Sequence, residues 1–388
     1  MGYDTDLSFL HYAPTRIVYG AGSLSELPSE LGSLGSDRAM IVTDRQIASR
    51  TDLIERVRKA LAKRCAAVFA EVEPDSSVAI VDKGAAIARQ HGVDALVSVG
   101  GGSSIDTAKA IAMVHTLGGS IRDHQGFQAL GSATTPHVAI PTTAGTGSEV
   151  TRYALIRDEQ SSQKLLFGDF HIFPRVAILD PKLTVGMPPL ITAGTGMDAL
   201  THALEGLHSA QREPIADALA LHAIRLIRKN LPIAIQTPQD LVARGMMLVA
   251  ATLAGTAFDN AQVGLVHAIA HTVGARHHVH HGLANSIALP AVLRFNADAA
   301  AEWYRMGGEA FGISTEAMSD AAAIDTIASA IEAFARDCGL PGRYRDVGVP
   351  ESDLEAIAEV TLTDGAIVYN PKPVTDPAEV LGVLRACY

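Results

Sequence analysis

Side chains that can bind a metal occur in two pairs with the same spacing. Asp198 and His202 are four residues apart, and the same spacing separates His267 from His271. Residues four apart lie on one face of a helix, and both segments are largely apolar, so each pair is expected to point into a core. Zinc and ferrous iron are bound by carboxylate and imidazole groups. The repeated spacing favours a metal site, although a single such histidine would more often be a hydrogen-bonded core residue.

Histidine is concentrated in one short stretch of the chain. Six of the 15 histidines fall within His267–His281. They are too many for one ion, so some must hold other ligands in place, face the substrate or lie on the surface. Spacing does not rank the last four of them, which are His277, His278, His280 and His281. The three cysteines are isolated in the sequence, which argues against a thiolate metal site or a disulfide framework.

Two loops have the composition of phosphate-binding turns. The first, Val-Gly-Gly-Gly-Ser-Ser-Ile-Asp-Thr-Ala-Lys at 99–109, follows a predicted strand and begins a helix. Its glycines let a ligand approach the backbone, and the helix N-terminus favours an anion; by itself it could equally be a tight turn. The second loop, 141–149, is rich in Thr, Ser and Gly. Because parallel strands end at one edge of a sheet, the two loops together predict a nucleotide site, without the G-x-G-x-x-G fingerprint of an ordinary Rossmann domain.

The elements that must carry these groups differ between the two halves of the chain. Apolar runs at 39–42, 67–72, 95–99, 137–140 and 176–179 alternate with helical patterns at 53–61, 78–88 and 105–114. This alternation predicts a Rossmann-like parallel sheet with helices on both faces. After residue 190 only helical segments are expected, such as 214–229, 241–257 and 321–338. We therefore expect an α/β domain at 1–188 and an all-α domain at 189–388.

Charge and hydropathy argue against two classes of binding partner, nucleic acids and membranes. A net charge of −11 without a dense Lys/Arg stretch argues against nucleic-acid binding. The start of the chain has no basic, apolar leader, so we expect a cytoplasmic protein. The apolar stretch at 245–258 is too short to span a bilayer and is expected to be a buried helix, so no membrane partner is predicted. Asp44 ends the first predicted strand, where it could bind a ribose hydroxyl or simply cap a helix.

Five segments resemble the iron-containing, group III alcohol dehydrogenases, which are related more distantly to glycerol dehydrogenase and dehydroquinate synthase. The matching segments are 17–22, 100–109, 141–151, 196–205 and 264–271 with 281–282. The resemblance implies an α/β dinucleotide-binding domain followed by an all-α metal-binding domain. It also implies NAD, with NADP as the alternative, one divalent metal, Fe²⁺ before Zn²⁺, and a homodimer or higher homo-oligomer.

The resemblance assigns roles to individual residues. Those implied as metal ligands are Asp198, His202, His267 and His281. His271 is implied to face the nicotinamide and the substrate, as the catalytic histidine, and Phe258 to line the substrate pocket. The implied cofactor contacts are Asp44, Gly101, Gly102, Ser103, Asp106, Thr142, Thr143, Thr146, Thr151 and Lys164.

Some positions depart from the family pattern and bear on the substrate. The departures are His280 for a usual Pro, the segment 276–279, Asp259 for a small residue, Asp75 for a usual Asn, and Lys372 for a usual Arg. Together with Arg152, several of these suggest a cationic pocket and a substrate carrying an anionic group.

The predicted reaction is reversible hydride transfer between NAD(H) and a small alcohol or aldehyde, with the metal as Lewis acid and His271 as proton relay. The alternatives are a lyase of the dehydroquinate synthase type and a noncatalytic protein that binds a nucleotide and a metal.

Overall fold

The computed structural model describes residues 7–160 and 163–388, which fold into two compact units. Among the described residues, one unit contains residues 14–192 and 236–255, and the other contains 7–13, 193–235 and 256–388. Residues 236–255 therefore pack with the first unit although they follow part of the second in sequence. This arrangement is not predicted from the sequence. The domain boundary at residue 188 stays a prediction.

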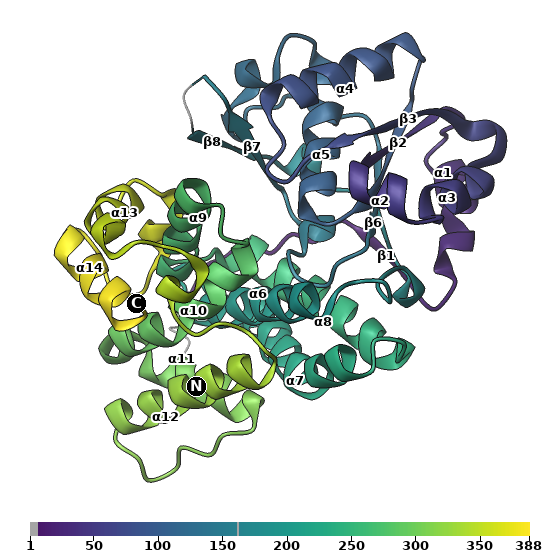
Figure 1. The fold of residues 1–388 in the computed structure, drawn as a ribbon. Helices are drawn as coiled ribbons and strands as arrows, with labels where there is room; N and C mark the ends of the chain where they lie inside the picture. Colours follow the sequence, from purple (N-terminus) through teal and green to yellow (C-terminus); the bar gives the residue numbers. More distant parts are fainter. Residues whose placement is uncertain (1–6, 161–162) are drawn as a thin grey trace. The chain divides into compact units, whose positions relative to one another are not determined.

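The first unit is built on a six-stranded parallel sheet (Figure 1). Its strand order is β1-β9-β6-β4-β2-β3. The strands are β1 (Arg16–Tyr19), β2 (Ala39–Asp44), β3 (Cys65–Val72), β4 (Ala95–Gly100), β6 (His137–Pro141) and β9 (Val176–Leu179). The predicted parallel sheet is confirmed, and each predicted strand is present to within a few residues.

Side chains from alternate positions of the central strands β2 and β4 enter two separate cores. Met40 of β2 packs with the helices α4 (Val78–Gln90) and α5 (Gly102–Leu117) on one face. Its neighbour Ile41 packs with α1 (Leu27–Ser33) and α3 (Leu53–Leu61) on the other. This period of two explains why the strands read as continuous apolar runs, because both faces are buried. A short helix, α2 (Arg45–Arg50), follows β2 directly.

A small second sheet has the order β5-β8-β7. Its strands are β5 (Gly126–Phe127), β7 (Tyr153–Asp158) and β8 (Gln163–Gly168), with β7 and β8 antiparallel. None of these three strands is predicted from the sequence.

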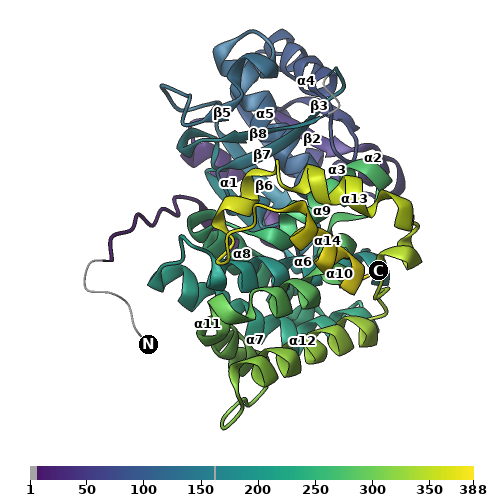
Figure 2. The same ribbon diagram turned by 90° about the vertical axis from the view of Figure 1, so that its left-hand side faces the viewer.

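The second unit is helical (Figure 2). The helices of the C-terminal half are α6 (Pro189–His208), α7 (Pro214–Gln236), α8 (Leu241–Ala261), α9 (Leu265–His277), α10 (His281–Phe295), α11 (Ala297–Phe311), α12 (Asp320–Asp337), α13 (Leu354–Thr361) and α14 (Pro377–Ala386). Among the described residues no strand follows β9, which confirms the predicted change from α/β to helical structure.

Helix α8 is the one helix among the described residues that is long and apolar enough to cross a membrane. It has 21 residues, and 61% of its most apolar window is buried inside the molecule. Core helices pass the same test of length and composition. Two charged residues that flank the apolar stretch, Arg244 and Asp259, are also buried.

Candidate metal centre and nucleotide loops

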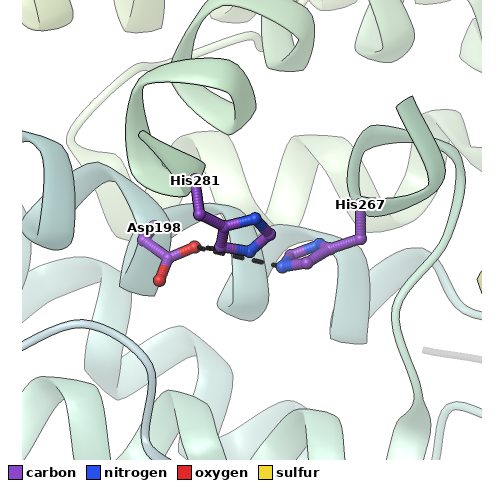
Figure 3. Close-up of side chains that lie close together, drawn as sticks. All are labelled: Asp198, His267 and His281. Carbon is purple, nitrogen blue, oxygen red and sulfur yellow. Dashed lines mark ion pairs between the residues drawn. The ribbon is translucent and has the colours of Figure 1, made fainter. Parts of the chain in front are cut away.

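Three histidines of the helical unit surround one carboxylate oxygen. The Nε2 atom of His281 lies 3.5 Å from Oδ1 of Asp198, and the Nε2 atoms of His267 and His202 each lie 4.0 Å from it. One ligand atom each from Asp198, His267 and His281 lie within 4.8 Å of one another (Figure 3). Helices α6, α9 and α10 supply these side chains, so residues far apart in sequence meet at one place.

The donor set fits a divalent transition metal. In a tetrahedral site, ligand atoms about 2.1 Å from the ion lie about 3.4 Å from each other, close to the spacing around Asp198. Asp198 and His267 are almost fully buried. A buried carboxylate is costly unless its negative charge is balanced by a positive group or a metal ion. Burial opposes ionisation of Asp198, but the neighbouring imidazoles of His202, His281 and His267 outweigh it and lower the pKa of the carboxyl.

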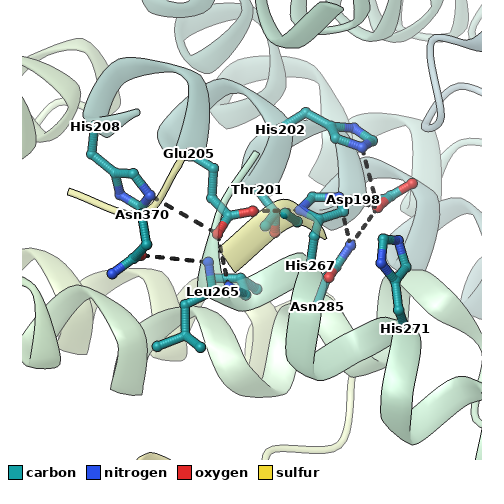
Figure 4. A network of polar contacts seen from close by, with 12 residues as sticks. Asp198, Thr201, His202, Glu205, His208, Leu265, His267, His271, Asn285 and Asn370 are labelled. Atoms are coloured by element: carbon teal, nitrogen blue, oxygen red, sulfur yellow. Dashed lines mark hydrogen bonds and ion pairs between the residues drawn. The ribbon is translucent and has the colours of Figure 1, made fainter. Parts of the chain in front are cut away.

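A buried glutamate orients one of these histidines. Oε2 of Glu205 accepts a hydrogen bond from Nδ1 of His267, so the Nε2 atom of that ring faces Asp198 (Figure 4). Glu205 also accepts from the Val266 N–H at 2.8 Å. Burial raises the pKa of Glu205, and the neighbouring His208 and the backbone hydrogen bonds act in the opposite direction.

Asn285 lies among the same donors, and the sequence analysis missed it. Its Nδ2 atom is 2.7 Å from Oδ1 of Asp198, 3.1 Å from Nε2 of His281 and 3.3 Å from Nε2 of His267. The available signal was its position four residues after His281, which places both side chains on one face of α10.

The remaining predicted residues of this unit lie next to the cluster. His271 stacks on His281 with ring centroids 5.4 Å apart, and its Nδ1 atom is 2.8 Å from Oδ2 of Asp364. His202 stacks on Phe258 at 4.3 Å. The structure thus brings Phe258 and His271 into contact with two of the predicted metal ligands, His202 and His281.

The other histidines of the 267–281 stretch have local roles. His278 ends α9 in the left-handed conformation, with φ of 56°, at a position that glycine most often occupies. His280 precedes α10, and its ring lies beside Gly194. Nε2 of His277 is 2.7 Å from Oδ2 of Asp353.

In the other unit the two predicted loops are in contact. A Cβ atom on Gly101 would lie 3.2 Å from Oγ1 of Thr143, and one on Gly102 would lie 2.9 Å from Cγ2 of Thr146. The absence of side chains on these glycines therefore lets the N-terminus of α5 approach the threonine loop. Ser103 is exposed in the first turn of α5, as expected for a residue that meets a ligand.

Asp44 lies beside the glycine loop and also caps a helix. Its Oδ1 atom accepts from the Ile47 N–H at 2.8 Å, and its Oδ2 atom would lie 3.6 Å from a Cβ on Gly100. The capping role and the place next to the loop are compatible, because different oxygens of the carboxylate serve them.

Two other predicted cofactor residues, Thr151 and Asp106, make hydrogen bonds to neighbouring residues of the same unit. Lys109 is fully buried and donates to Oγ1 of Thr151 at 3.0 Å and to Oγ of Ser148 at 3.2 Å. Asp106 accepts from the Ser148 hydroxyl and from the Leu155 N–H at 3.2 Å. These contacts hold Thr151 and Asp106 within the protein.

Two further predicted cofactor residues are Lys164 and Thr142. Nζ of Lys164 is 2.7 Å from Oδ1 of Asp75. Asp75, which stands where the family usually has Asn, therefore pairs with Lys164, a predicted cofactor residue. Thr142 directly follows β6 and is almost fully buried.

Two family models together match nearly the whole chain. Residues 14–181 match the model described as iron-containing alcohol dehydrogenase, and residues 192–388 match that of the Fe-containing alcohol dehydrogenase family, C-terminal. The chain belongs to the iron-containing alcohol dehydrogenase family. The resemblance seen in the five sequence segments is thereby confirmed.

Individual relatives are similar over their full length. The chain is 40% identical over 374 residues to the NAD-dependent methanol dehydrogenase of Bacillus methanolicus, covering 95% of this chain and 98% of that protein. A crystal structure of 1,3-propanediol oxidoreductase matches with a TM-score of 0.93 and 35% identity, covering 98% of this chain and 100% of that one. Sulfoacetaldehyde reductase from Bifidobacterium kashiwanohense, in complex with NAD+, matches with a TM-score of 0.88 and 30% identity, covering 98% of each chain.

Three of the basic residues that suggested an anionic substrate, Arg276, His277 and Lys372, lie against carboxylates. Arg276 donates two hydrogen bonds to Asp353, at 2.5 and 2.8 Å, and His277 contacts the same carboxylate. Nζ of Lys372 is 3.6 Å from Asp298. The sequence analysis did not predict these pairings.

Arg152, the fourth cation, lies in the other unit. Its guanidinium carbon is 4.7 Å from the centroid of the Phe170 ring.

Proposed function

We propose that this chain transfers a hydride reversibly between NAD(H) and a small alcohol or aldehyde, with a divalent metal bound by Asp198, His202, His267 and His281. The observation that carries the proposal is the convergence of three imidazole Nε2 atoms on one buried carboxylate in a chain of this family. A metal at this place would supply Lewis acidity toward the substrate oxygen. We propose Fe²⁺ over Zn²⁺ because the family is iron-containing, while the donor set suits both.

His271 is proposed to carry the proton between the substrate and water. A carboxylate only accepts hydrogen bonds, so Asp364 fixes the ring with its hydrogen on Nδ1 and leaves the lone pair on Nε2. The His271 side chain is 21% exposed, which allows exchange with solvent. A neutral imidazole held in this way can accept a proton from an alcohol and release it again.

The first unit is proposed to bind the dinucleotide. Backbone N–H groups at the start of α5 and the hydroxyls of Thr143 and Thr146 suit a pyrophosphate. The Oδ2 atom of Asp44 suits a ribose hydroxyl, and its charge would repel a phosphate on that ribose, which supports NAD over NADP.

The substrate is proposed to contact Phe258, whose ring stacks on His202. An anionic group on the substrate is a further proposal, although Arg276 and Lys372, two of the cations that suggested it, lie against carboxylates. Equal turnover of a neutral aldehyde and its carboxylate-bearing analogue would remove this part of the proposal.

We also propose a homodimer. Strand β1 lies at one edge of the six-stranded sheet, and its Ile17 and Tyr19 side chains are exposed. An edge strand with exposed apolar side chains favours pairing with another chain.

The experiment removes and restores the metal while nicotinamide absorbance is followed. Metal-free protein is expected to gain turnover with Fe²⁺ or Zn²⁺, and Asp198→Ala to lose both bound metal and at least about 100-fold of the activity. Asp337→Ala, at an exposed position of α12, serves as the control and should retain both. Net NADH accumulation on addition of an alcohol excludes the lyase alternative, whose nicotinamide is restored within each cycle. Turnover without metal would contradict the proposal.

A further inference from the structure

Glu205 is a fully buried carboxylate that makes two contacts with consecutive residues of α9. One oxygen, Oε1, accepts from the Val266 N–H at 2.8 Å, and the other, Oε2, contacts Nδ1 of His267. The same side chain therefore fixes the first turn of α9 and the imidazole that this turn carries (Figure 4).

The contact with Nδ1 decides which nitrogen of His267 can bind a metal. A carboxylate has no hydrogen to donate, so the imidazole hydrogen lies on Nδ1 and the lone pair on Nε2. Nε2 is the atom that faces Asp198, at 4.0 Å from its Oδ1. With the hydrogen on Nε2 instead, the ring would present a donor to the cluster and could not act as a ligand.

The surroundings of Glu205 hold it in place. Gly264 precedes α9, and a Cβ there would lie 3.2 Å from Nε2 of His208 and 3.3 Å from Oε1 of Glu205, so the absence of a side chain allows the close approach. His208 is itself held by the Tyr304 hydroxyl, 2.6 Å from its Nδ1. Both His208 and Tyr304 are buried, which leaves Glu205 little freedom to rotate.

We propose that Glu205 is a positioning residue that fixes the metal-binding tautomer of His267 and thereby sets the affinity of the metal centre. This inference rests on the proposed function only in requiring that Asp198 and His267 bind a metal. Outer partners of this kind typically change metal affinity 10- to 100-fold when they are replaced.

The main test is Glu205→Gln. The amide oxygen can still accept from the Val266 N–H, so the start of α9 is preserved, but the amide nitrogen would donate to Nδ1 of His267 and reverse the tautomer. The control is Glu213→Gln, because buried Glu213 likewise accepts from the backbone at the start of a helix, α7, and contacts a histidine, His11, at 2.8 Å.

Zn²⁺ affinity is measured by competition with a chromophoric chelator, and the melting temperature of each metal-free protein is recorded. Glu205→Gln is expected to bind Zn²⁺ about 10- to 100-fold more weakly than wild type, with Glu213→Gln within about 2-fold. Wild-type affinity in Glu205→Gln, or an equal loss in Glu213→Gln, would overturn the inference. A wild-type protein that binds neither Zn²⁺ nor Fe²⁺ would instead refute the proposed function.

A second measurement needs no folded variant at position 205. Two-bond ¹H–¹⁵N spectra of histidine-labelled, metal-free wild type report the tautomer of each ring, and the signals of His267 are those lost in His267→Asn. The inference predicts the Nδ1–H form for His267. An Nε2–H form would overturn it, whatever the behaviour of Glu205→Gln.

Discussion

Replacement of Gly282 by alanine should displace His281 from the metal centre. Gly282 is the second residue of α10, directly after His281, and it packs against the backbone of α6. A Cβ there would lie 2.2 Å from the carbonyl oxygen of Gly194 and 2.6 Å from its carbonyl carbon. Ordinary contact begins at 3.4 Å, so the first distance is short by about 1.2 Å (3.4 − 2.2) and the start of α10 must move by a similar amount.

Two opposing effects determine how Gly282→Ala changes the free energy of unfolding. Overpacking against backbone costs about 1–3 kcal/mol, whereas alanine in place of glycine stabilises a helix by up to about 1 kcal/mol. Gly282→Ala should therefore lower the free energy of unfolding by about 0–3 kcal/mol. A shift of about 1 Å at His281, whose Nε2 is 3.5 Å from Asp198, should weaken metal binding by about 10-fold or more.

The control is Gly382→Ala in the interior of α14, where an added Cβ meets no atom within 4 Å. This variant should be as stable as wild type or more stable by up to about 1 kcal/mol, with unchanged metal affinity. The assays are urea unfolding of the metal-free proteins and chelator competition for Zn²⁺. If Gly282→Ala matched Gly382→Ala in both assays, the argument from backbone contact would be refuted.

Two further predictions concern the first unit. Burial lowers the pKa of His137 to about 3, so the unfolded chain binds more protons between pH 3 and 6.5 and stability falls as pH falls through that window. His137→Gln should reduce the slope of the free energy of unfolding against pH in this window by up to about 1.4 kcal/mol per pH unit, whereas exposed His222→Gln should leave the slope unchanged. The slopes are measured by urea unfolding at several pH values, and equal slopes for the two variants would contradict this prediction. Asp44→Asn keeps an oxygen for the Ile47 N–H but loses the charge, and it should raise kcat/KM for NADP relative to NAD about 10-fold; an unchanged ratio would remove Asp44 from cofactor selection.

The elements that carry the strongest periodicity could be predicted from the sequence. Strand β9 and helix α3 have the predicted bounds, because a doubly buried strand and an amphipathic helix each leave a clear local pattern. Strands β7 and β8 were not predicted because their apolar runs are only three or four residues long and are bounded by charged residues such as Arg157 and Lys164. The packing of residues 236–255 with the sheet unit leaves no local signal, because those residues have the same helical pattern as their neighbours.

Candidate ligands could be predicted, but their partners could not. The spacing of four in Asp198–His202 is a property of one helix, and it was visible without a structure. The contacts of His267 with Glu205 and of His271 with Asp364 join residues 62 and 93 positions apart, and only the fold brings them together. Arg276 and Asp353 are 77 positions apart, so their pairing also depends on the fold, and from the sequence alone Arg276 suggested an anionic substrate.

The central claim is that one divalent metal binds at the carboxylate of Asp198. The most direct measurement is an anomalous difference map from crystals of protein purified under anaerobic conditions, with data collected on both sides of the iron absorption edge. Our account predicts a single strong peak within bonding distance of Asp198, His202, His267 and His281. A map with no peak at these residues, from protein that turns over alcohol with NAD, would contradict it.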